Sequence, residues 1–153
     1  MNDLMIRPAV IEDAALLLSW VNSADSLRWK QHTAGPVSPM DHDDWLRSRL
    51  ASPVTKIWII VSSGVDIGQI RLEKKASFVY TDIYLIPAAR GNNNASVGLN
   101  KALKEYSVME SDQNFCAVLH IDNKSSQNLF SRNGFKQIEN DDSNWLRFIR
   151  HAK

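Results

Sequence analysis

Apolar residues recur along the chain with two different periods, and these periods predict where helices and strands lie. Residues 14–21 carry apolar side chains at positions i, i+3, i+4 and i+7, the spacing of an amphipathic helix. A second helix is predicted from Ser38-Pro39 to about Ala51, because a capping hydroxyl, a proline at the first helical position and early acids all favour a helix start. Between the two helices, residues 24–37 keep no steady period, so we expect a long loop there.

Short apolar, β-branched and aromatic runs predict the strands of the fold. Such runs lie at Leu4–Arg7, Lys56–Ser62, Ile67–Glu73, Phe78–Ile86, Phe115–Ile121, Phe135–Ile138 and Trp145–Ile149. Further helices are expected from Ala95 to about Tyr106 and over Ser125–Asn133, with Gly134 ending the second of them. This order of elements predicts an α/β (α+β) fold, built on one sheet of about seven strands with about four helices.

The composition is that of an ordinary globular protein. The chain has 153 residues, which predicts a single domain over residues 1–153. Its 18 basic and 17 acidic residues give a net charge of +1 without a basic block, so we expect no nucleic-acid or membrane partner. The one cysteine, Cys116, lies in an apolar run and is expected to be a buried structural thiol, so neither a disulfide nor a cysteine-based metal site is expected. No signal peptide and no run of ~20 apolar residues is present, so a cytoplasmic location is expected.

One candidate binding motif follows the strand that ends near Ile86. After Pro87, the polar, glycine-containing segment Arg90–Ala95 opens a helix. A tight loop of small residues at a helix N-terminus exposes backbone N–H groups beside the positive end of the helix dipole, which is an arrangement that holds phosphate. The same pattern fits an ordinary strand-to-helix turn with asparagine as the cap, and the motif alone does not separate the two.

A second motif lies near the end of the chain. An apolar strand is followed by Asn123, then by Ser126, an aromatic residue at Phe130 and the pair Gly134-Phe135. In this register the segment resembles the closing half of the acetyl-coenzyme A site in the GNAT family of N-acetyltransferases. The segment Arg90–Ala95 is then similar to the pyrophosphate loop of that family, and two motifs in the right order are more specific than either alone. The resemblance covers essentially the whole chain.

The resemblance implies a mixed, mostly antiparallel sheet that splays between its fourth and fifth strands. In the family the pantetheine arm of acetyl-coenzyme A enters this gap, an amine attacks the thioester directly, and no metal takes part. The thioester carbonyl is expected to meet a backbone N–H near Leu85 or Ile86. The full set of implied cofactor contacts is Leu85, Ile86, Arg90, Gly91, Asn92, Asn93, Asn94, Ala95, Ser96, Asn123, Phe130 and Arg132.

The sequence departs from the family pattern at two positions. Asn93 replaces the middle glycine of the loop, and asparagine is the non-glycine residue that best tolerates the positive φ needed there. Its side chain is expected either to donate to a phosphate oxygen or to crowd the cofactor. Phe130 replaces a tyrosine that in many members reprotonates the leaving thiolate. Phenylalanine cannot donate a proton, so the proton comes from another residue or from water, or is not required.

Candidates for the amine side of the reaction lie on and around the fourth strand. Tyr80, Asp82 and Tyr84 alternate on one strand face, with Asp82 as the leading proton acceptor, Tyr84 as a second catalytic candidate and Tyr80 as a substrate contact. His42, in the first turn of the second helix, is the remaining catalytic candidate, and the alternative for it is an exposed surface imidazole.

The expected loop 24–37 supplies two candidates for substrate contact, Trp29 and His32. Trp29 is expected either to stack on a nucleotide base or to pack as a lid. His120, at the end of the fifth strand, is expected to be structural.

The N-terminal half carries a narrower resemblance. Arg7-Pro8-Ala9, Asp13, Trp20-Val21-Asn22 and the pair His42 and Trp45 are similar to acetyltransferases of nucleotide-linked amino-sugars in the pseudaminic-acid pathway. The leading hypothesis is therefore a small-molecule amine as substrate, first of all a nucleotide-linked amino-sugar, for a monomeric or homodimeric enzyme. Two alternatives stay open, namely a protein or peptide N-acetyltransferase and a non-catalytic module that binds acyl-coenzyme A.

Overall fold

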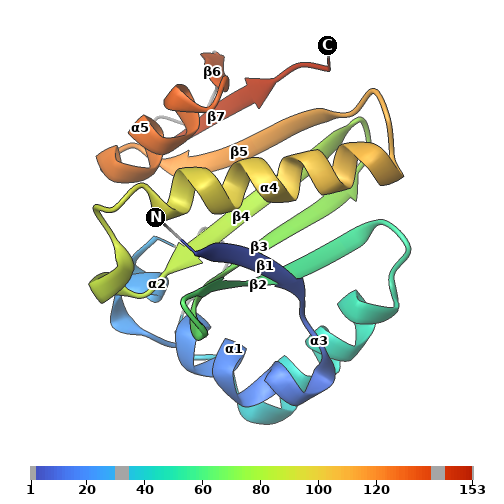
Figure 1. The fold of residues 1–153 in the computed structure, drawn as a ribbon, viewed down its shortest axis with the longest axis vertical. Coiled ribbons are helices and arrows are strands. Elements are labelled where there is room, and N and C mark those ends of the chain that lie inside the picture. Colours follow the sequence, from blue (N-terminus) through green and yellow to red (C-terminus); the bar gives the residue numbers. More distant parts are fainter. Residues whose placement is uncertain (1–2, 30–34, 139–143, 153) are drawn as a thin grey trace.

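The computed structural model describes residues 3–29, 35–138 and 144–152, which form seven strands and five α-helices (Figure 1). The strands are β1 (Leu4–Pro8), β2 (Thr55–Ser62), β3 (Val65–Lys75), β4 (Phe78–Leu85), β5 (Asn114–His120), β6 (Lys136–Ile138) and β7 (Trp145–Arg150). The helices are α1 (Ala14–Val21), α2 (Ala24–Arg28), α3 (Pro39–Ala51), α4 (Asn94–Met109) and α5 (Lys124–Arg132), with short 3-10 turns η1 (Ile11–Asp13) and η2 (Pro87–Ala89). The predicted fold class is confirmed.

All seven strands belong to one sheet, in the order β1-β2-β3-β4-β5-β7-β6. The pair β4–β5 is parallel and the other neighbouring pairs are antiparallel. A parallel pair needs a crossover connection, and α4 supplies it. The helix lies across one face of the sheet, while α1 and α3 lie on the other face, beside β2 (Figure 1).

Two hydrophobic clusters hold these layers together, and β2 contributes to both. Trp58 and Ile60 pack into the cluster under α4, whereas Ile57, Ile59 and Val61 pack against α1 and α3. A strand that is buried on both faces needs apolar residues at every position, which explains the continuous run in the sequence. β2 is therefore buried between the two layers of helices.

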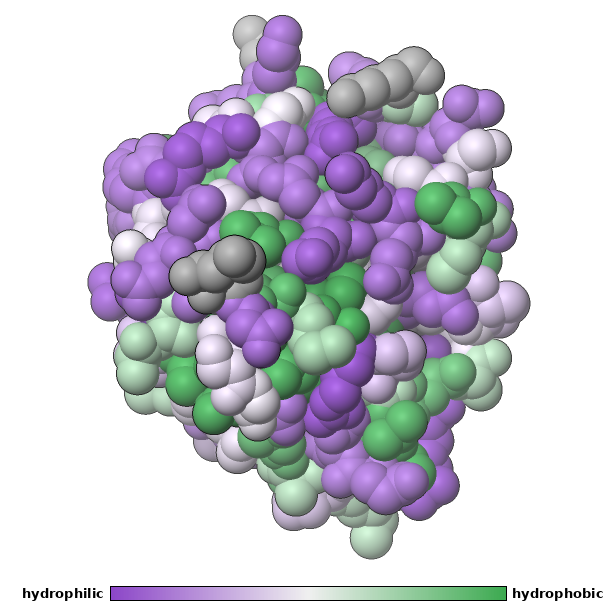
Figure 2. Space-filling model, in the orientation of Figure 1, coloured by the Kyte–Doolittle hydropathy of each residue, from purple (hydrophilic) through white to green (hydrophobic). Residues whose placement is uncertain are grey.

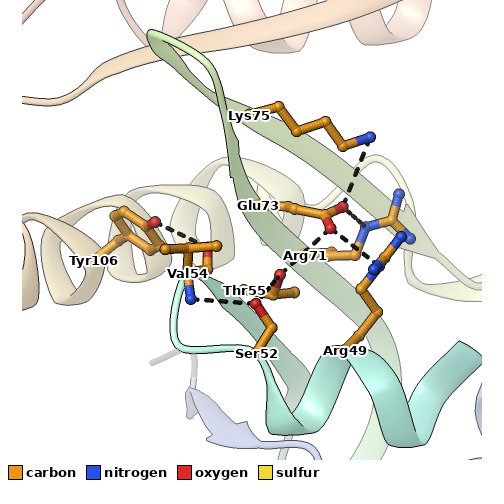
Figure 3. Close-up of polar contacts among 8 residues, drawn as sticks. All are labelled: Arg49, Ser52, Val54, Thr55, Arg71, Glu73, Lys75 and Tyr106. Carbon is orange, nitrogen blue, oxygen red and sulfur yellow. Dashed lines mark hydrogen bonds and ion pairs between the residues drawn. The ribbon is translucent and has the colours of Figure 1, made fainter.

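A buried carboxylate joins α3 to the β2–β3 hairpin (Figure 3). Glu73 is 8% exposed, and its side chain lies 3.0 Å from Nε of Arg49 and 3.9–4.0 Å from the cationic groups of Lys75 and Arg71. The Thr55 hydroxyl donates to the same carboxylate at 3.4 Å. Three cations surround one buried acid, so this cluster carries a net positive charge.

The helix starts follow the predicted capping, with one addition. Ser38 caps α3, because its hydroxyl accepts from the N–H of Asp41 at 3.1 Å, and Pro39 is the first helical residue as expected. The expectation of a continuous loop over 24–37 is wrong at its start, where Ser23 caps the five-residue helix α2. A helix of five residues is too short to show a hydrophobic period, so the sequence pattern could not reveal it.

The predicted splay between β4 and β5 is confirmed. These strands pair only at Phe78–Asn114, Val79–Phe115 and Tyr80–Cys116, and beyond Tyr80 they share no paired residue among those described. Beyond this point β4 stays paired with β3 as far as Leu85, while β5 stays paired with β7 as far as His120. A wedge-shaped gap therefore opens in the sheet toward the carboxyl ends of both strands, and the parallel pair closes it at Tyr80.

The surface in the view of Figure 2 is mostly hydrophilic, with apolar side chains reaching it near the middle, beside α4 and β1. Apolar residues next to the gap are only partly buried, among them Ile83 and Ile86 from the β4 side and Leu119 from β5. Within the described ranges no helix has the length and apolarity to span a lipid bilayer.

Candidate active site

The loop after β4 forms the predicted turn and helix start. η2 ends at Ala89, α4 begins at Asn94, and the intervening segment is exposed at the surface. Asn93 has φ 63° and ψ 9°, which is the left-handed conformation expected of the residue that replaces glycine, and Gly91 has φ 87°. Asn93 makes no side-chain cap bond to α4, so the first N–H groups of this helix have no cap from that residue and remain suited to an anion.

Asn94 and Arg90 hold this loop in place. The buried Asn94 amide donates to the carbonyl of Ala89 at 3.1 Å. Arg90 donates from Nε and Nη2 to the carbonyl of Leu85 at 3.0 and 2.7 Å, and also binds the Asp25 carboxylate. Its guanidinium lies 5.6 Å from the centroid of the Tyr84 ring. The Arg90 side chain thus ties α2 to the end of β4, which makes it a support for the loop.

The edge of β4 that faces the gap can be read from its hydrogen bonds to β3. The Ile86 N–H donates to the Ile67 carbonyl at 2.9 Å, so in an antiparallel ladder the even-numbered residues of β4 point their backbone groups toward β3. The odd-numbered residues Thr81, Ile83 and Leu85 therefore point theirs toward β5, where the gap lies. The expectation that Ile86 could bind the thioester carbonyl is wrong, because its N–H is already bonded to β3.

Leu85 remains a candidate hydrogen-bond donor to the cofactor arm, and Ile83 joins it. Sequence reasoning missed Ile83, although strand alternation counted from Leu85 would have found it. Both residues have their side chains on the α4 face, and the gap is lined there by apolar groups such as Leu119. An apolar slot with backbone N–H groups along one edge suits a flexible arm that carries amides.

The second motif serves mainly to build α5. The Asn123 carboxamide oxygen accepts from the Ser126 N–H at 3.3 Å and caps this helix. Phe130 is 1% exposed and packs edge-on against Phe135 with ring centroids 4.9 Å apart, while Arg132 is exposed in the last turn. These contacts fix α5 against β5, which forms one wall of the gap.

Tyr80, Asp82 and Tyr84 lie on the opposite sheet face from α4, which we call the acceptor face. The Asp82 carboxylate accepts from Nε2 of Gln69 at 3.0 Å, and Asp82 stands opposite Arg71 in the β3–β4 register. The Tyr84 ring lies 6.0 Å from the ring of Trp20 and packs partly into the cluster under α1 and α3. All three side chains are partly exposed, so they remain accessible beside the gap.

His42 differs from both interpretations offered by the sequence. It is 5% exposed, so the imidazole is not a surface group, and it faces the core side of α3 together with Leu46. Burial lowers the pKa of His42, which keeps the ring neutral near pH 7. α3 packs on β2, and β3 stands between β2 and β4, so this position gives His42 no direct path to the gap.

Three aromatic side chains meet at the open end of β5. The His120 ring lies 5.6 Å from Trp29 and 5.0 Å from Trp145, and the Arg28 guanidinium lies 4.5 Å from the Trp29 ring. This packing favours Trp29 as a lid over Trp29 as a stacking platform. The Asp122 N–H donates to Nδ1 of His120 at 3.1 Å, so a neutral His120 carries its proton on Nε2 and acts there as a donor. His32 lies outside the described residues.

Trp145 was not among the candidates from the sequence. The cluster joins Trp29, His120 and Trp145 from three segments far apart in the chain, so no local sequence pattern could have predicted it. Among the His, Cys, Asp and Glu residues of the described ranges, no three gather in a way that could hold a metal ion.

The residues that carry the narrower resemblance have structural partners. Arg7 forms a two-pronged ion pair with Asp13, with both distances 2.9 Å, and this pair lowers the pKa of the Asp13 carboxyl. The Asn22 side chain bonds both backbone groups of Val37, at 2.7 and 2.8 Å, and Trp20 is buried in the core. These positions hold β1 and the helices together and give no information on the acceptor.

Comparisons with known proteins agree with this architecture. The sequence pattern of the acetyltransferase (GNAT) domain matches residues 3–136, so the chain belongs to the GNAT family of acetyl-coenzyme A-dependent N-acetyltransferases. A search of curated proteins by sequence gives no match.

Several solved structures share the fold at low identity. A ribosomal alpha-N-protein acetyltransferase, RimL, in complex with coenzyme A has a TM-score of 0.82 and 16% identity, over 97% of this chain and 94% of that one. A spermidine N-acetyltransferase from Vibrio cholerae, in complex with coenzyme A and spermine, has a TM-score of 0.81 and 12% identity, over 95% of this chain and 93% of that one. An aminoglycoside acetyltransferase in complex with coenzyme A has a TM-score of 0.76 and 16% identity, over 97% of this chain and 95% of that one. These three proteins have different acceptors, so the shared fold alone leaves the acceptor open.

Proposed function

We propose that this protein transfers an acetyl group from acetyl-coenzyme A to the amine of a small molecule, with the cofactor arm in the gap between β4 and β5. The observation that carries the proposal is the position of two features at one end of the sheet. The gap opens at the carboxyl end of β4, and the Arg90–Ser96 loop with the α4 N-terminus begins directly beyond it. A phosphate group bound by the loop would place the pantetheine arm at the mouth of the gap.

The cofactor contacts follow from this placement. N–H groups of residues 91–96 bind the pyrophosphate, and the left-handed Asn93 keeps the backbone there close to the ligand. Ile83 presents its N–H and C=O groups, and Leu85 presents its N–H group, to the amides of the arm, as a neighbouring strand would. Asn123, Phe130 and Arg132 stand on the α5 side of the same arm.

The reaction is a direct attack of a neutral amine on the thioester carbonyl. The N–C bond forms, the C–S bond breaks, and its electron pair passes to sulfur, which leaves as the coenzyme A thiolate. Asp82 accepts the proton that the amine loses, either directly or through water, and Gln69 orients the carboxylate. Tyr80 and Tyr84 flank Asp82 and position the amine. Phe130 donates no proton, so the thiolate is protonated from solvent.

We propose a nucleotide-linked amino-sugar as the acceptor, on the strength of the charge on the acceptor face. Arg71, Lys75 and Arg147 share this face by strand register, and the buried Glu73 is surrounded by cations. Such a face suits an amine that carries phosphate and disfavours a polyamine, whose recognition needs surplus carboxylates. Protein or peptide amines are the second candidate, because RimL shows that this fold can serve that class.

The test compares acceptors and one variant. Coenzyme A release is measured with nucleotide-linked amino-sugars, spermidine and N-terminal peptides, and the proposal expects the highest kcat/KM with the first. Asp82→Asn should lower kcat by about a hundredfold, and Asp112→Asn, in the exposed turn before β5, should leave it unchanged. Turnover of spermidine above the sugar nucleotides, or an Asp82→Asn variant with full kcat, would contradict these assignments.

A further inference from the structure

Among the described residues, one buried side-chain hydroxyl has no hydrogen-bond partner. Thr81 is 8% exposed, and its Oγ1 has no hydrogen-bond partner within the part of the chain that the structure describes. In the same described ranges, two further buried atoms lack a hydrogen bond, Arg49 Nε and Arg150 Nη1. Both belong to long charged side chains, and Arg49 Nε still lies 3.0 Å from Glu73. Folded proteins rarely keep a buried hydroxyl unpaired, because the lost hydration is not returned. The fold alone therefore does not explain why a hydroxyl is present at position 81.

The position of Thr81 in the sheet suggests what this hydroxyl binds. It is the first residue of β4 beyond the last β4–β5 pair, Tyr80–Cys116, so it stands at the closed end of the gap. Its side chain lies on the α4 face, like that of Val79 two residues earlier. Continuing the register would place Ala117 beside it on β5, and this buried residue carries only a methyl group. The tip of the gap thus has one polar side-chain donor and a small neighbour.

We propose that the Thr81 hydroxyl donates a hydrogen bond to the thioester end of acetyl-coenzyme A. The inference rests on the proposed binding of the cofactor arm in the gap, because an arm that enters beside Leu85 ends toward Thr81. When the amine adds to the carbonyl carbon, negative charge develops on the carbonyl oxygen, and when the C–S bond breaks it passes to sulfur. Thr81 keeps its proton throughout and stabilises this charge by the hydrogen bond.

The alternative is that the Thr81 hydroxyl serves the fold, through a hydrogen bond that it makes in the free protein. Valine would fill the same volume with the shape of threonine and would bring no polar atom into the core. The two roles thus predict opposite results for Thr81→Val. If the hydroxyl serves the cofactor, its replacement removes an unpaired buried group and raises the Tm of the free protein, by about 2–4 °C. If the hydroxyl serves the fold, the same change lowers the Tm.

The experiment uses the full chain, with Thr81→Val and the control Thr81→Ser, which keeps the hydroxyl. For Thr81→Val we expect a higher Tm without ligand, a Kd for acetyl-coenzyme A about five- to tenfold weaker, and a kcat at least tenfold lower. Thr81→Ser should keep kcat within threefold of the wild type. Coenzyme A without the acetyl group should bind wild type and Thr81→Val with Kd values within about twofold, because it lacks the thioester.

The outcomes separate this inference from the proposed function. Amine acetylation with the same kcat in wild type and Thr81→Val overturns the role of Thr81 and leaves the proposed function standing. A wild type that acetylates no small amine, together with weaker acetyl-coenzyme A binding by Thr81→Val, overturns the proposed acceptor and supports Thr81. A lower Tm for Thr81→Val with unchanged Kd overturns the inference and assigns the hydroxyl to the fold.

Discussion

At the scale of single residues, the left-handed conformation of Asn93 explains how the loop can work without its glycine. Glycine is used at such positions because it has no Cβ to clash, and asparagine is the mildest replacement. The φ of 63° at Asn93 confirms the conformation expected from the sequence. The substitution therefore keeps the backbone path and adds only an exposed side chain.

Asn93→Gly should consequently leave the affinity for acetyl-coenzyme A within about threefold, measured by titration calorimetry. Asn93→Val should destabilise the protein by about 1–2 kcal/mol, because a β-branched residue is strained at positive φ. Lys101→Ala, at an exposed position of α4, is the control and should change neither quantity. A gain of tenfold or more in affinity for Asn93→Gly would instead mean that the asparagine side chain blocks the phosphate site.

His42 gives a prediction about pH. Burial lowers its pKa in the folded state, so below its ordinary pKa of about 6.5 the unfolded chain binds more protons than the folded one. Stability should therefore fall as the pH drops from about 6.5 toward 5. His42→Phe should flatten this part of the curve of unfolding free energy against pH, whereas His151→Gln, at an exposed position, should not. An unchanged slope in His42→Phe would show that His42 does not titrate there.

At the scale of elements, local signals predicted the helices and strands well, and long-range contacts did not follow from them. Ser38-Pro39 predicted the start of α3 correctly, because capping is a local effect. The five-residue α2 was missed for lack of a period. The splay came only from the family resemblance, because register between β4 and β5 involves residues more than 30 positions apart.

The β3–β4 pair that carries the gap depends on Gly68. A Cβ at this position would lie 2.1 Å from the carbonyl oxygen of Tyr84 and 2.9 Å from a side-chain carbon of Leu85, so the two strands would have to separate. Gly68→Ala should cost about 3 kcal/mol in unfolding free energy, because the added methyl group overpacks the contact between the two strands. Gly35→Ala, with no atom within 4 Å of the added Cβ, is the matched control and should be near neutral. Equal urea midpoints for the two variants would contradict the close approach.

At the scale of the whole molecule, the candidate site lies where the carboxyl end of β4 meets the start of α4. Only the parts of this site that are contiguous in the chain could be predicted from the sequence. The loop and the α5 motif are each contiguous, so both were recognised. The sequence could not show that the Ile86 N–H is bonded to Ile67, because the direction of each backbone N–H of β4 depends on its pairing with β3. Thr81 and the cluster of Trp29, His120 and Trp145 were not predicted, because each depends on how distant segments meet.

The central claim is that acetyl-coenzyme A lies along the open edge of β4, and amide hydrogen exchange measured by NMR tests it most directly. On addition of saturating acetyl-coenzyme A, the amides of Ile83 and Leu85 should become strongly protected, because the arm takes the place of the missing strand. The amide of Ile86 should be protected with or without ligand, because it already donates to Ile67. If bound acetyl-coenzyme A left the exchange of Ile83 and Leu85 unchanged, the cofactor would lie elsewhere and the account of the gap would be wrong.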